Sequence, residues 1–339
     1  MFGFDGAALA VALVSQAAAM MPGPAPPVPE PALEAIRVPP ALARRTATLE
    51  PSGVVWARGL DRYLIVSDDT GSETDHHQPW LLAMSRSGAF DEAVVPLLGI
   101  DALNDAESIC AGPEEGTFFI ATSHSPNRKG RTPEARRMLL LTRLAGRALR
   151  VEGRVDLTTA RDRGGAGLLQ LAGLPADGRL DIEAITFHDG ALLIGLKSPL
   201  SARNAAVVLR FQDPLAALRA GTIPPGAVTR AWEVALSDGG GIPRGIADLT
   251  TLPDGTLIVV ANAPKGRTSD NGGAVFSLRD GGPAQLLHWF AHQRPEGATL
   301  AADGTSLIVV FDNHEKPPTW ARLPLPAAGA AVKKSAGAR

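Results

Sequence analysis

The chain has 339 residues, 45% of them hydrophobic and 20% charged, so it is long and apolar enough to bury a full core. Its 33 Lys and Arg residues against 35 Asp and Glu residues leave a formal net charge of −2, which excludes the global basic field that draws proteins to nucleic acid. The 36 Gly and 28 Pro residues predict many tight turns between short elements, as in all-β repeat folds. The lone Cys110 excludes an internal disulfide and a multi-thiolate zinc site, and we interpret it as core packing.

Residues 1–31 combine features of an export signal with a Pro-rich linker. An apolar stretch covers 7–14, small residues at 17–19 are typical of a cleavage site, and prolines follow over 22–31. Against this, the first sixteen residues contain no Lys or Arg and include Asp5. We therefore expect an extracytoplasmic location, periplasmic or secreted, with a cytoplasmic one as the alternative. No later apolar run approaches the ~20 residues that a membrane-spanning helix needs.

One short pattern recurs along the rest of the chain. It consists of a polar residue, apolar residues, a turn, and an apolar run that ends in a polar group. In chain order, the five copies begin at Ser52, Glu107, Glu183, Asp248 and Glu296 and end at Asp68, Ser123, Lys197, Asn262 and Asp312. The spacing of the copies brackets the length of a propeller blade with some long loops added.

Each copy predicts a β-hairpin. The turns at 253–256 and 302–305 contain Asp-Gly between two strand-like runs, a strong short-range hairpin signal. The run 257–260 that follows the first of these turns is apolar on both faces, as expected of a strand between two sheets. Further strands follow each hairpin, which favours four strands per unit.

We therefore expect residues 32–326 to form a single all-β domain, a β-propeller of about five four-stranded blades, with six blades as the alternative. Only one clear strand, around 319–323, remains after Asp312. The segment Leu33–Val38 is expected to complete the last blade and close the ring, which removes two open sheet edges. The tail 327–339 is expected to be disordered, and the protein to be a monomer.

The first and last residues of the copies are expected to form two polar rings around one mouth of the central channel. We call the first residues the entry ring and the last residues the exit ring. Like charges ~5 Å apart repel by roughly 3 kcal/mol, so these carboxylates require a cation, a basic partner such as Lys197 or Arg244, or protonation. As ligands of a divalent cation such as calcium we predict Glu107, Glu183, Asp248 and Glu296. The alternative is that these acidic residues cap backbone amides or pair with the neighbouring blade.

Loops after the exit ring add polar groups to the same face. The loop 68–77 carries Asp69 among carboxylates and imidazoles, although its spacing matches no standard zinc motif. The loop 123–131 continues to Arg136 and Arg137 and forms a basic cluster suited to a phosphate or carboxylate. Both loops could instead be simply solvated. The predicted ligand-binding residues are Asp68, Asp69, Ser123, Arg128, Lys129, Lys197, Arg244, Asn262, Asp312 and Asn313.

His124 is a candidate acid or base. Neighbouring residues on an extended strand point to opposite faces, so Ser123 and His124 are poorly placed to act as a nucleophile and its base. We predict catalytic roles for His124, Glu107 and Glu183.

Several of these segments resemble a family of bacterial propellers known as domain of unknown function 3616. The likeness rests on the segments Ser52–Trp56, Ser67–Thr70, Glu107–Ile109, Ser123–Lys129, Asp181–Ile185 and Gly195–Pro199. It covers residues 50–315 and implies a propeller fold without an assigned reaction. Glu107-Ser and Glu183-Ala depart from the Glu-Gly expected there. A looser similarity to the esterase-like activity of phytase propellers implies carboxylates around a channel mouth, at the level of the fold only.

Two classes of function follow from these observations. The first is a metal-assisted hydrolase, esterase-like or phosphoesterase-like, acting on a small anionic or sugar-derived substrate. The second is a pocket that binds a sugar or peptide without chemistry, or a scaffold for protein partners. The sequence leaves open which of these applies.

Overall fold

Nearly every regular element in the computed structural model is a β-strand. The structure describes residues 30–46, 49–68, 70, 77–175, 177–237, 241–263, 272–279, 281–312 and 317–325. Two compact parts divide the chain, Met1–Pro31 and Ala32–Arg339, and all the elements described below belong to the second. Of the predicted signal-like segment 1–31, only residues 30 and 31 are described, and the tail 327–339 lies outside the described residues. Within the described residues no helix has the length and apolar character to cross a membrane.

The strands form five successive antiparallel groups of four, which we call repeats 1 to 5. Repeat 1 contains β2 (Pro51–Ala57), β3 (Arg62–Ser67), β4 (Trp80–Met84) and β5 (Val95–Leu98). Repeat 2 contains β6 (Ala106–Ala111), β7 (Thr117–Thr122), β8 (Met138–Ala145) and β9 (Ala148–Asp156). The outer strands β5 and β9 also pair in parallel, Leu97 opposite Leu149, which joins the two repeats into one eight-stranded sheet.

The next two repeats are separate four-stranded sheets. Repeat 3 contains β10 (Asp181–His188), β11 (Ala191–Ser198), β12 (Ala206–Gln212) and β13 (Val228–Val234). Repeat 4 contains β14 (Gly245–Thr251), β15 (Leu257–Asn262), β16 (Gly273–Leu278) and β17 (Gln285–Phe290). Short helices lie in the connections: α1 (Pro40–Ala43), α2 (Leu168–Leu171), α3 (Pro214–Ala220) and the 3₁₀ turns Arg58–Leu60, Glu134–Arg136 and Leu157–Thr159.

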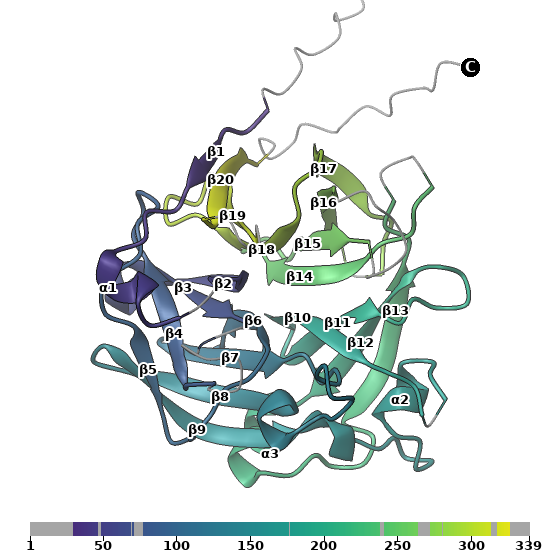
Figure 1. Cartoon of the computed structure of the whole chain (residues 1–339). Helices are drawn as coiled ribbons and strands as arrows, with labels where there is room; N and C mark the ends of the chain where they lie inside the picture. Colours follow the sequence, from purple (N-terminus) through teal and green to yellow (C-terminus); the bar gives the residue numbers. More distant parts are fainter. Residues whose placement is uncertain are drawn as a thin grey trace, which may run out of the picture. The chain divides into compact units, whose positions relative to one another are not determined.

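Repeat 5 is assembled from both ends of the chain. It contains β18 (Pro295–Leu300), β19 (Ser306–Phe311), β20 (Thr319–Pro324) and, as its fourth strand, β1 (Leu33–Ala35). β1 runs antiparallel to β20 with Leu33 opposite Ala321, and Figure 1 shows the two side by side. The prediction that the segment after residue 32 supplies a strand to the last repeat is confirmed by this pairing.

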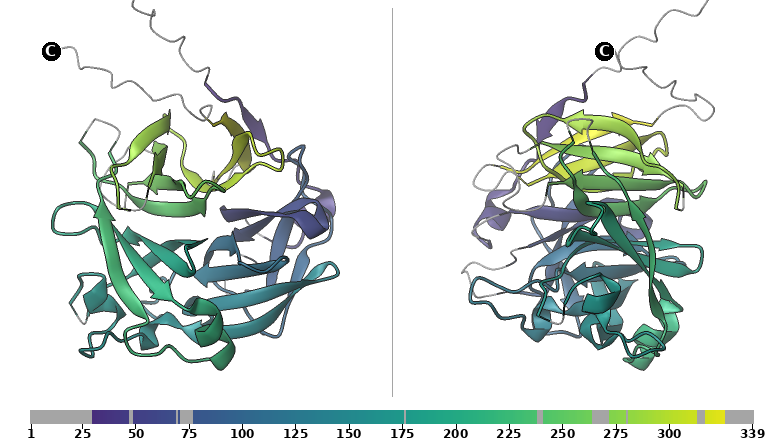
Figure 2. Two further views of the ribbon diagram at one scale, coloured as in Figure 1. Left: turned by 180° about the vertical axis from the view of Figure 1, so that it is seen from behind. Right: turned by 90° about the vertical axis from the view of Figure 1, so that its right-hand side faces the viewer.

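The first strands of the repeats contact one another in a closed cycle. β2 contacts β6, β6 contacts β10, β10 contacts β14, β14 contacts β18, and β18 contacts β2 again. In Figure 1 these strands lie innermost and β5, β9 and β13 outermost; Figure 2 shows the same order of sheets from behind and from the side.

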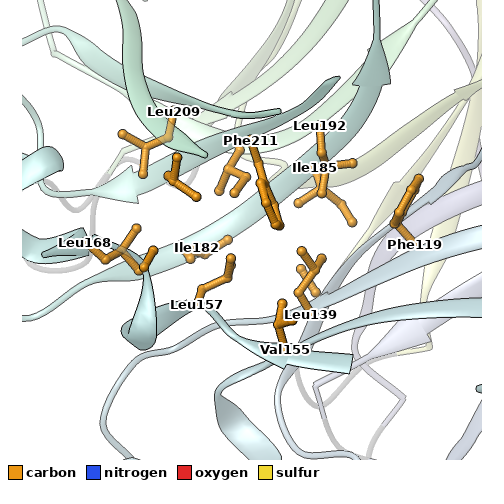
Figure 3. Close-up of a cluster of buried hydrophobic side chains, with 14 of the residues drawn as sticks. Phe119, Leu139, Val155, Leu157, Leu168, Ile182, Ile185, Leu192, Leu209 and Phe211 are labelled. Carbon is orange, nitrogen blue, oxygen red and sulfur yellow. The ribbon is translucent and has the colours of Figure 1, made fainter. Parts of the chain in front are cut away.

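A separate apolar cluster fills each interface between successive repeats. Figure 3 shows the one between repeats 2 and 3, where Phe119 and Leu139 meet Ile182 and Phe211. Cys110 belongs to this cluster and is 6% exposed, which confirms its predicted packing role. Second strands such as β15 are buried along their whole length because a sheet covers each face.

The predicted turns close the hairpins. Between β10 and β11, Asp189 and Gly190 both have positive φ angles of 46° and 74°, the conformation that a two-residue hairpin with right-handed strand twist requires. Between β14 and β15, the Asp254 side chain accepts a hydrogen bond from the Thr256 amide at 3.0 Å. Local sequence therefore fixes where each strand turns back.

Candidate functional site

The inner strand of every repeat is irregular at the same place. Its pairing with the second strand shifts between Pro51 and Val54, Ala106 and Ser108, Ile182 and Ala184, Ile246 and Asp248, and Pro295 and Gly297. A β-bulge of this kind adds an unpaired residue and re-aims its side chain. The bulged residues are Ser52 with Gly53, then Glu107, Glu183, Ala247 and Glu296. Four of the five predicted entry-ring residues thus occupy one equivalent position.

The predicted exit ring also shares one position. Just before each bulge, Pro51, Ala106, Ile182, Ile246 and Pro295 pair with Ser67, Thr122, Leu196, Ala261 and Phe311, respectively. The residues that follow these partners are Asp68, Ser123, Lys197, Asn262 and Asp312. The exit ring is therefore adjacent to the bulges around the cycle.

Asp248 does not belong to the entry ring, and our alignment of the fourth copy was wrong by one residue. The bulged residue there is Ala247, while Asp248 is equivalent to Ser108 of repeat 2. A slip of one residue along a strand moves a side chain to the opposite face. Asp248 is 1% exposed and accepts hydrogen bonds from the Ser108 hydroxyl at 3.0 Å and the Ala298 amide at 2.9 Å, so it links inner strands.

A cavity of about 800 Å³ lies where the two rings meet. The predicted residues that line it are Asp68, Glu107, Arg128, Lys129, Glu183, Lys197, Glu296 and Asp312. Repeats 1, 2, 3 and 5 contribute its walls, and no described residue of repeat 4 lines it. The absence of repeat 4 agrees with its small bulged residue, Ala247.

Our sequence reasoning missed a third equivalent position that lines the same cavity. Two residues before each bulged residue, repeats 1, 2, 3 and 5 carry a charged side chain: Glu50, Asp105, Asp181 and Arg294. Repeat 4 has Gly245 there. Side chains two residues apart on a strand point to the same face, so the spacing from the entry ring could have identified these residues.

Three carboxylates converge on one side of the cavity. Asp68, Asp105 and Glu107 each offer an oxygen, and these oxygens lie within 4.8 Å of one another. The Ser52 hydroxyl donates a hydrogen bond to Asp68, and the Arg136 guanidinium forms an ion pair with Asp105. We call Asp68, Asp105 and Glu107 the acidic cluster.

Burial and mutual repulsion favour the protonated forms within the acidic cluster. Burial, followed by the charge of Asp105, raises the pKa of Asp68 from 3.8 to about 8, although hydrogen bonds from Ser52 and Glu107 oppose the shift. Burial, followed by the charge of Asp68, raises the pKa of Glu107 well above its ordinary value. Asp68 therefore retains its proton at neutral pH, and Glu107 holds its proton more tightly than an exposed carboxyl group does, unless a cation replaces these protons.

On the other side of the cavity, Lys197 compensates two further carboxylates. Its ammonium group forms an ion pair with Glu183 and lies 3.6 Å from Glu296 Oε2. Arg294 Nε lies 3.3 Å from Glu296 Oε1, and Asn262 donates to Oε2 at 3.1 Å. Burial raises the pKa of Glu183, and the Lys197 ammonium opposes this rise. The four predicted metal ligands are thus divided between the acidic cluster, the Lys197 group and, for Asp248, the contact between inner strands.

A cationic rim borders the acidic cluster. The loop after β7 brings Arg128, Lys129 and Arg131 to the same cavity. The Asn127 side chain holds this loop by accepting hydrogen bonds from the amides of Lys129 and Arg131, both at 3.0 Å. Arg136 connects this loop to the cluster, since its guanidinium pairs with Asp105 and its Nε donates to the Ser125 carbonyl at 3.0 Å.

Ser123, His124 and Arg244 do not line this cavity. The Ser123 hydroxyl is buried 2.9 Å from that of Ser125, and His124 lines a different cavity. Arg244 is fully buried, with its guanidinium 4.4 Å from the Trp289 ring centre, and donates to the Gly272 carbonyl at 2.6 Å. The structure thus places Arg244 against Trp289 and Gly272 and not in the lining of the cavity. Asp69 and Asn313 lie outside the described residues.

No protein-family model and no curated protein matches the sequence. Among solved structures, a luciferin-regenerating enzyme is similar at 10% identity and a TM-score of 0.44, over 87% of this chain and 96% of that one. A glycoside-hydrolase family 43 β-1,3-galactosidase is similar at 10% identity and a TM-score of 0.46, over 82% of this chain and 90% of the other. The Dos1 propeller is similar at 11% identity and a TM-score of 0.34, over 82% of this chain and 58% of that one. At these identities and TM-scores the likenesses assign neither a family nor an activity to this chain.

Proposed function

We propose that the chain is a single five-bladed β-propeller whose mixed-charge cavity is the active site of a metal-assisted hydrolase. The closed cycle of inner strands supports the propeller, with the eight-stranded sheet counted as two blades joined at their outer strands. The resemblance to domain of unknown function 3616 fits this fold and adds no reaction.

The observation that carries the proposal is the acidic cluster beside a cationic rim. Carboxylate oxygens are the ligands that calcium and magnesium prefer, and three of them converge here. The Ser52 hydroxyl and the Asn104 side chain line the same cavity and offer further oxygens. The residues present therefore fit a hard divalent cation, for which Asp68, Asp105 and Glu107 are the proposed ligands in place of the group predicted from sequence.

The rim defines the class of substrate. Arg128, Lys129 and Arg131 carry three positive charges on one loop and would bind a phosphate or carboxylate group. A bound cation would polarise the scissile ester bond as a Lewis acid. An anionic ester held between the rim and the cluster meets both requirements, so we propose a small anionic or sugar-derived ester as the substrate.

A carboxyl group that holds the cation cannot also supply the proton for a leaving group. Glu107 is buried and burial raises its pKa, but as a proposed ligand it would give up this proton when the cation binds, so its role here is that of a ligand. Lys197 is unsuited to act as a base: burial lowers its pKa, but the charges of Glu183 and Glu296 outweigh burial and raise the pKa above its ordinary value. His124 lines another cavity and is left out of the reaction that we propose.

The ion pair between Arg136 and Asp105 favours a second candidate function. It already compensates part of the acidic cluster without a cation. The same cavity would then bind a sugar through its hydrogen-bonding side chains without turnover.

A substrate screen separates the two functions. We expect the full chain to hydrolyse phosphate or carboxylate esters with calcium present and to lose this activity in a chelator. Glu107→Gln should lower turnover about 100-fold through loss of a charged ligand of the cation, whereas the exposed Glu115→Gln should leave it unchanged. Turnover that survives chelation, or sugar binding with no turnover of any ester, would overturn the hydrolase proposal.

A further inference from the structure

A second cavity, of about 500 Å³, lies apart from the acidic cluster. The connection after β7 and the connection between β9 and β10 form its walls, and among the described residues Pro126 alone lines both cavities. The proposed hydrolase does not use it, although two of its lining residues, His124 and Arg137, are among those that the sequence pattern singled out. Its lining includes three arginines, Arg137, Arg161 and Arg179, beside the apolar side chains of Leu168 and Leu180.

His124 presents an acceptor in this cavity. Its ring is 4% exposed, and Nδ1 lies 2.8 Å from the Thr122 carbonyl oxygen. Because a carbonyl only accepts, Nδ1 carries the proton of the neutral ring and Nε2 carries the lone pair. Burial lowers the pKa of His124 to about 4, so the ring is neutral at pH 7. Its buried Nε2 atom has no hydrogen-bond partner among the described residues.

Arg137 presents a donor in the same cavity. One of its terminal nitrogens lies 3.3 Å from the Asp156 carboxylate, while its buried Nε has no hydrogen-bond partner within the described part of the chain. Buried polar atoms are nearly always hydrogen-bonded in folded proteins. The two unsatisfied atoms belong to residues that line one cavity, and a bound group that can both donate and accept, as a hydroxyl does, would satisfy them.

The surrounding side chains add the rest of the ligand's chemistry. Arg161 is fixed at the cavity by hydrogen bonds from its Nη1 to the carbonyls of Thr158 and Ala160, both at 2.7 Å. With Arg137 and Arg179 it provides positive charge for an anion, and Leu168 and Leu180 provide contact for carbon atoms. We propose that this cavity binds a small hydroxycarboxylate, with the carboxylate at the arginines and the hydroxyl donating to His124 Nε2.

The site is separate from the proposed active site although one segment borders both. His124 and Arg137 line the second cavity, whereas the adjacent Ser125 and Arg136 line the first. The His124 amide donates to the Arg136 carbonyl at 2.8 Å, which holds the two stretches together. Binding here requires neither a cation nor the acidic cluster.

Glycolate, the smallest 2-hydroxycarboxylate, is the probe for the test, and acetate is the control that lacks the hydroxyl. We expect calorimetry on the full chain in chelator to show glycolate binding more tightly than acetate. His124→Asn should weaken glycolate binding by about ten-fold or more, the usual effect of losing a hydrogen bond to a charged ligand. Asn tolerates the positive φ of 60° at this position.

His292→Asn is the matched control, because His292 has a similar φ of 58° and is exposed outside the cavity. It should bind glycolate like the unmodified protein, and so should Glu107→Gln, which separates this site from the proposed active site. If His124→Asn fails to fold, the ¹⁵N shift of His124 Nε2 on adding glycolate to the unmodified protein decides the question. Unchanged binding in His124→Asn, no shift of Nε2, or equal binding of acetate would overturn the proposal.

Discussion

Asp68 and Glu107 are two acidic groups whose protonation depends on the folded state. Each is a carboxyl group that is mostly removed from water and lies beside another carboxyl group. Because the pKa of Asp68 rises from 3.8 to about 8 on folding, the folded state binds an extra proton between these values. By linkage, the stabilisation from this proton is fully present below the unfolded pKa and is lost as pH rises through the folded one.

In a chelating buffer, we expect the free energy of unfolding to fall between pH 5 and pH 8, with a slope of up to about 1.4 kcal/mol per pH unit for each titrating proton. Asp68→Asn removes one titrating group, so its stability should depend less steeply on pH. Chemical denaturation across this range measures both slopes. The exposed Asp101→Asn should behave like the unmodified protein, and an equal slope for Asp68→Asn would contradict the shift.

At the same scale, the sequence predicted which positions carry polar groups but not how those groups pair. The exit ring was predictable because each apolar run ends at one polar residue, as at Asp68 and Lys197. The ion pair of Lys197 with Glu183 depends on the register within one repeat, and the approach of Lys197 to Glu296 of another repeat depends on the distance between sheets. No local pattern encodes this distance, so a single cation site was expected where the structure has two differently compensated groups.

At the scale of elements, the β-bulge in each inner strand controls what faces the cavity. The bulged residue points to the cavity in four repeats, and the next residue packs against a neighbouring inner strand. That next residue is small in most repeats: Gly53, Ser108, Ala184 and Gly297. In repeat 4 it is Asp248, which is accommodated because it hydrogen-bonds Ser108 and Ala298. Repeat 4 carries its acidic residue one position after the bulge, so aligning the copies on their acidic residues misplaced Asp248 by one.

Gly297 tests this close packing. A Cβ atom there would lie 2.1 Å from the Ser52 carbonyl oxygen, a backbone atom that cannot rotate away. We expect Gly297→Ala to lower the free energy of unfolding by about 1 to 3 kcal/mol, the usual range for overpacking. At Gly164 the nearest atom is 3.4 Å away on the flexible Asp162 side chain, so Gly164→Ala should cost much less. Equal denaturation midpoints for the two variants would show that the inner strands can separate freely.

At the scale of the whole molecule, much of the arrangement could be predicted from the repeat. Five copies of one pattern correspond to five groups of four strands, and the strand missing after β20 is supplied by β1. The parallel pairing of β5 with β9 could not be predicted, because it involves only two residue pairs and leaves no periodic signal. The lining of the cavity reflects differences between the repeats. Repeat 4 has Gly245 and Ala247 where the other repeats have polar side chains, and none of its described residues lines the cavity.

The central proposal is that Asp68, Asp105 and Glu107 hold a divalent cation. Measuring calcium binding at two pH values tests it most directly. In calorimetric titrations of the full chain we expect tighter binding at pH 8 than at pH 6, with proton release, because the cation must displace protons from carboxyls with raised pKa values. Glu107→Gln should weaken binding by about ten-fold or more through loss of a charged ligand, and Glu115→Gln should not. Binding that is equal at both pH values, or unaffected by Glu107→Gln, would contradict a cation site at the acidic cluster.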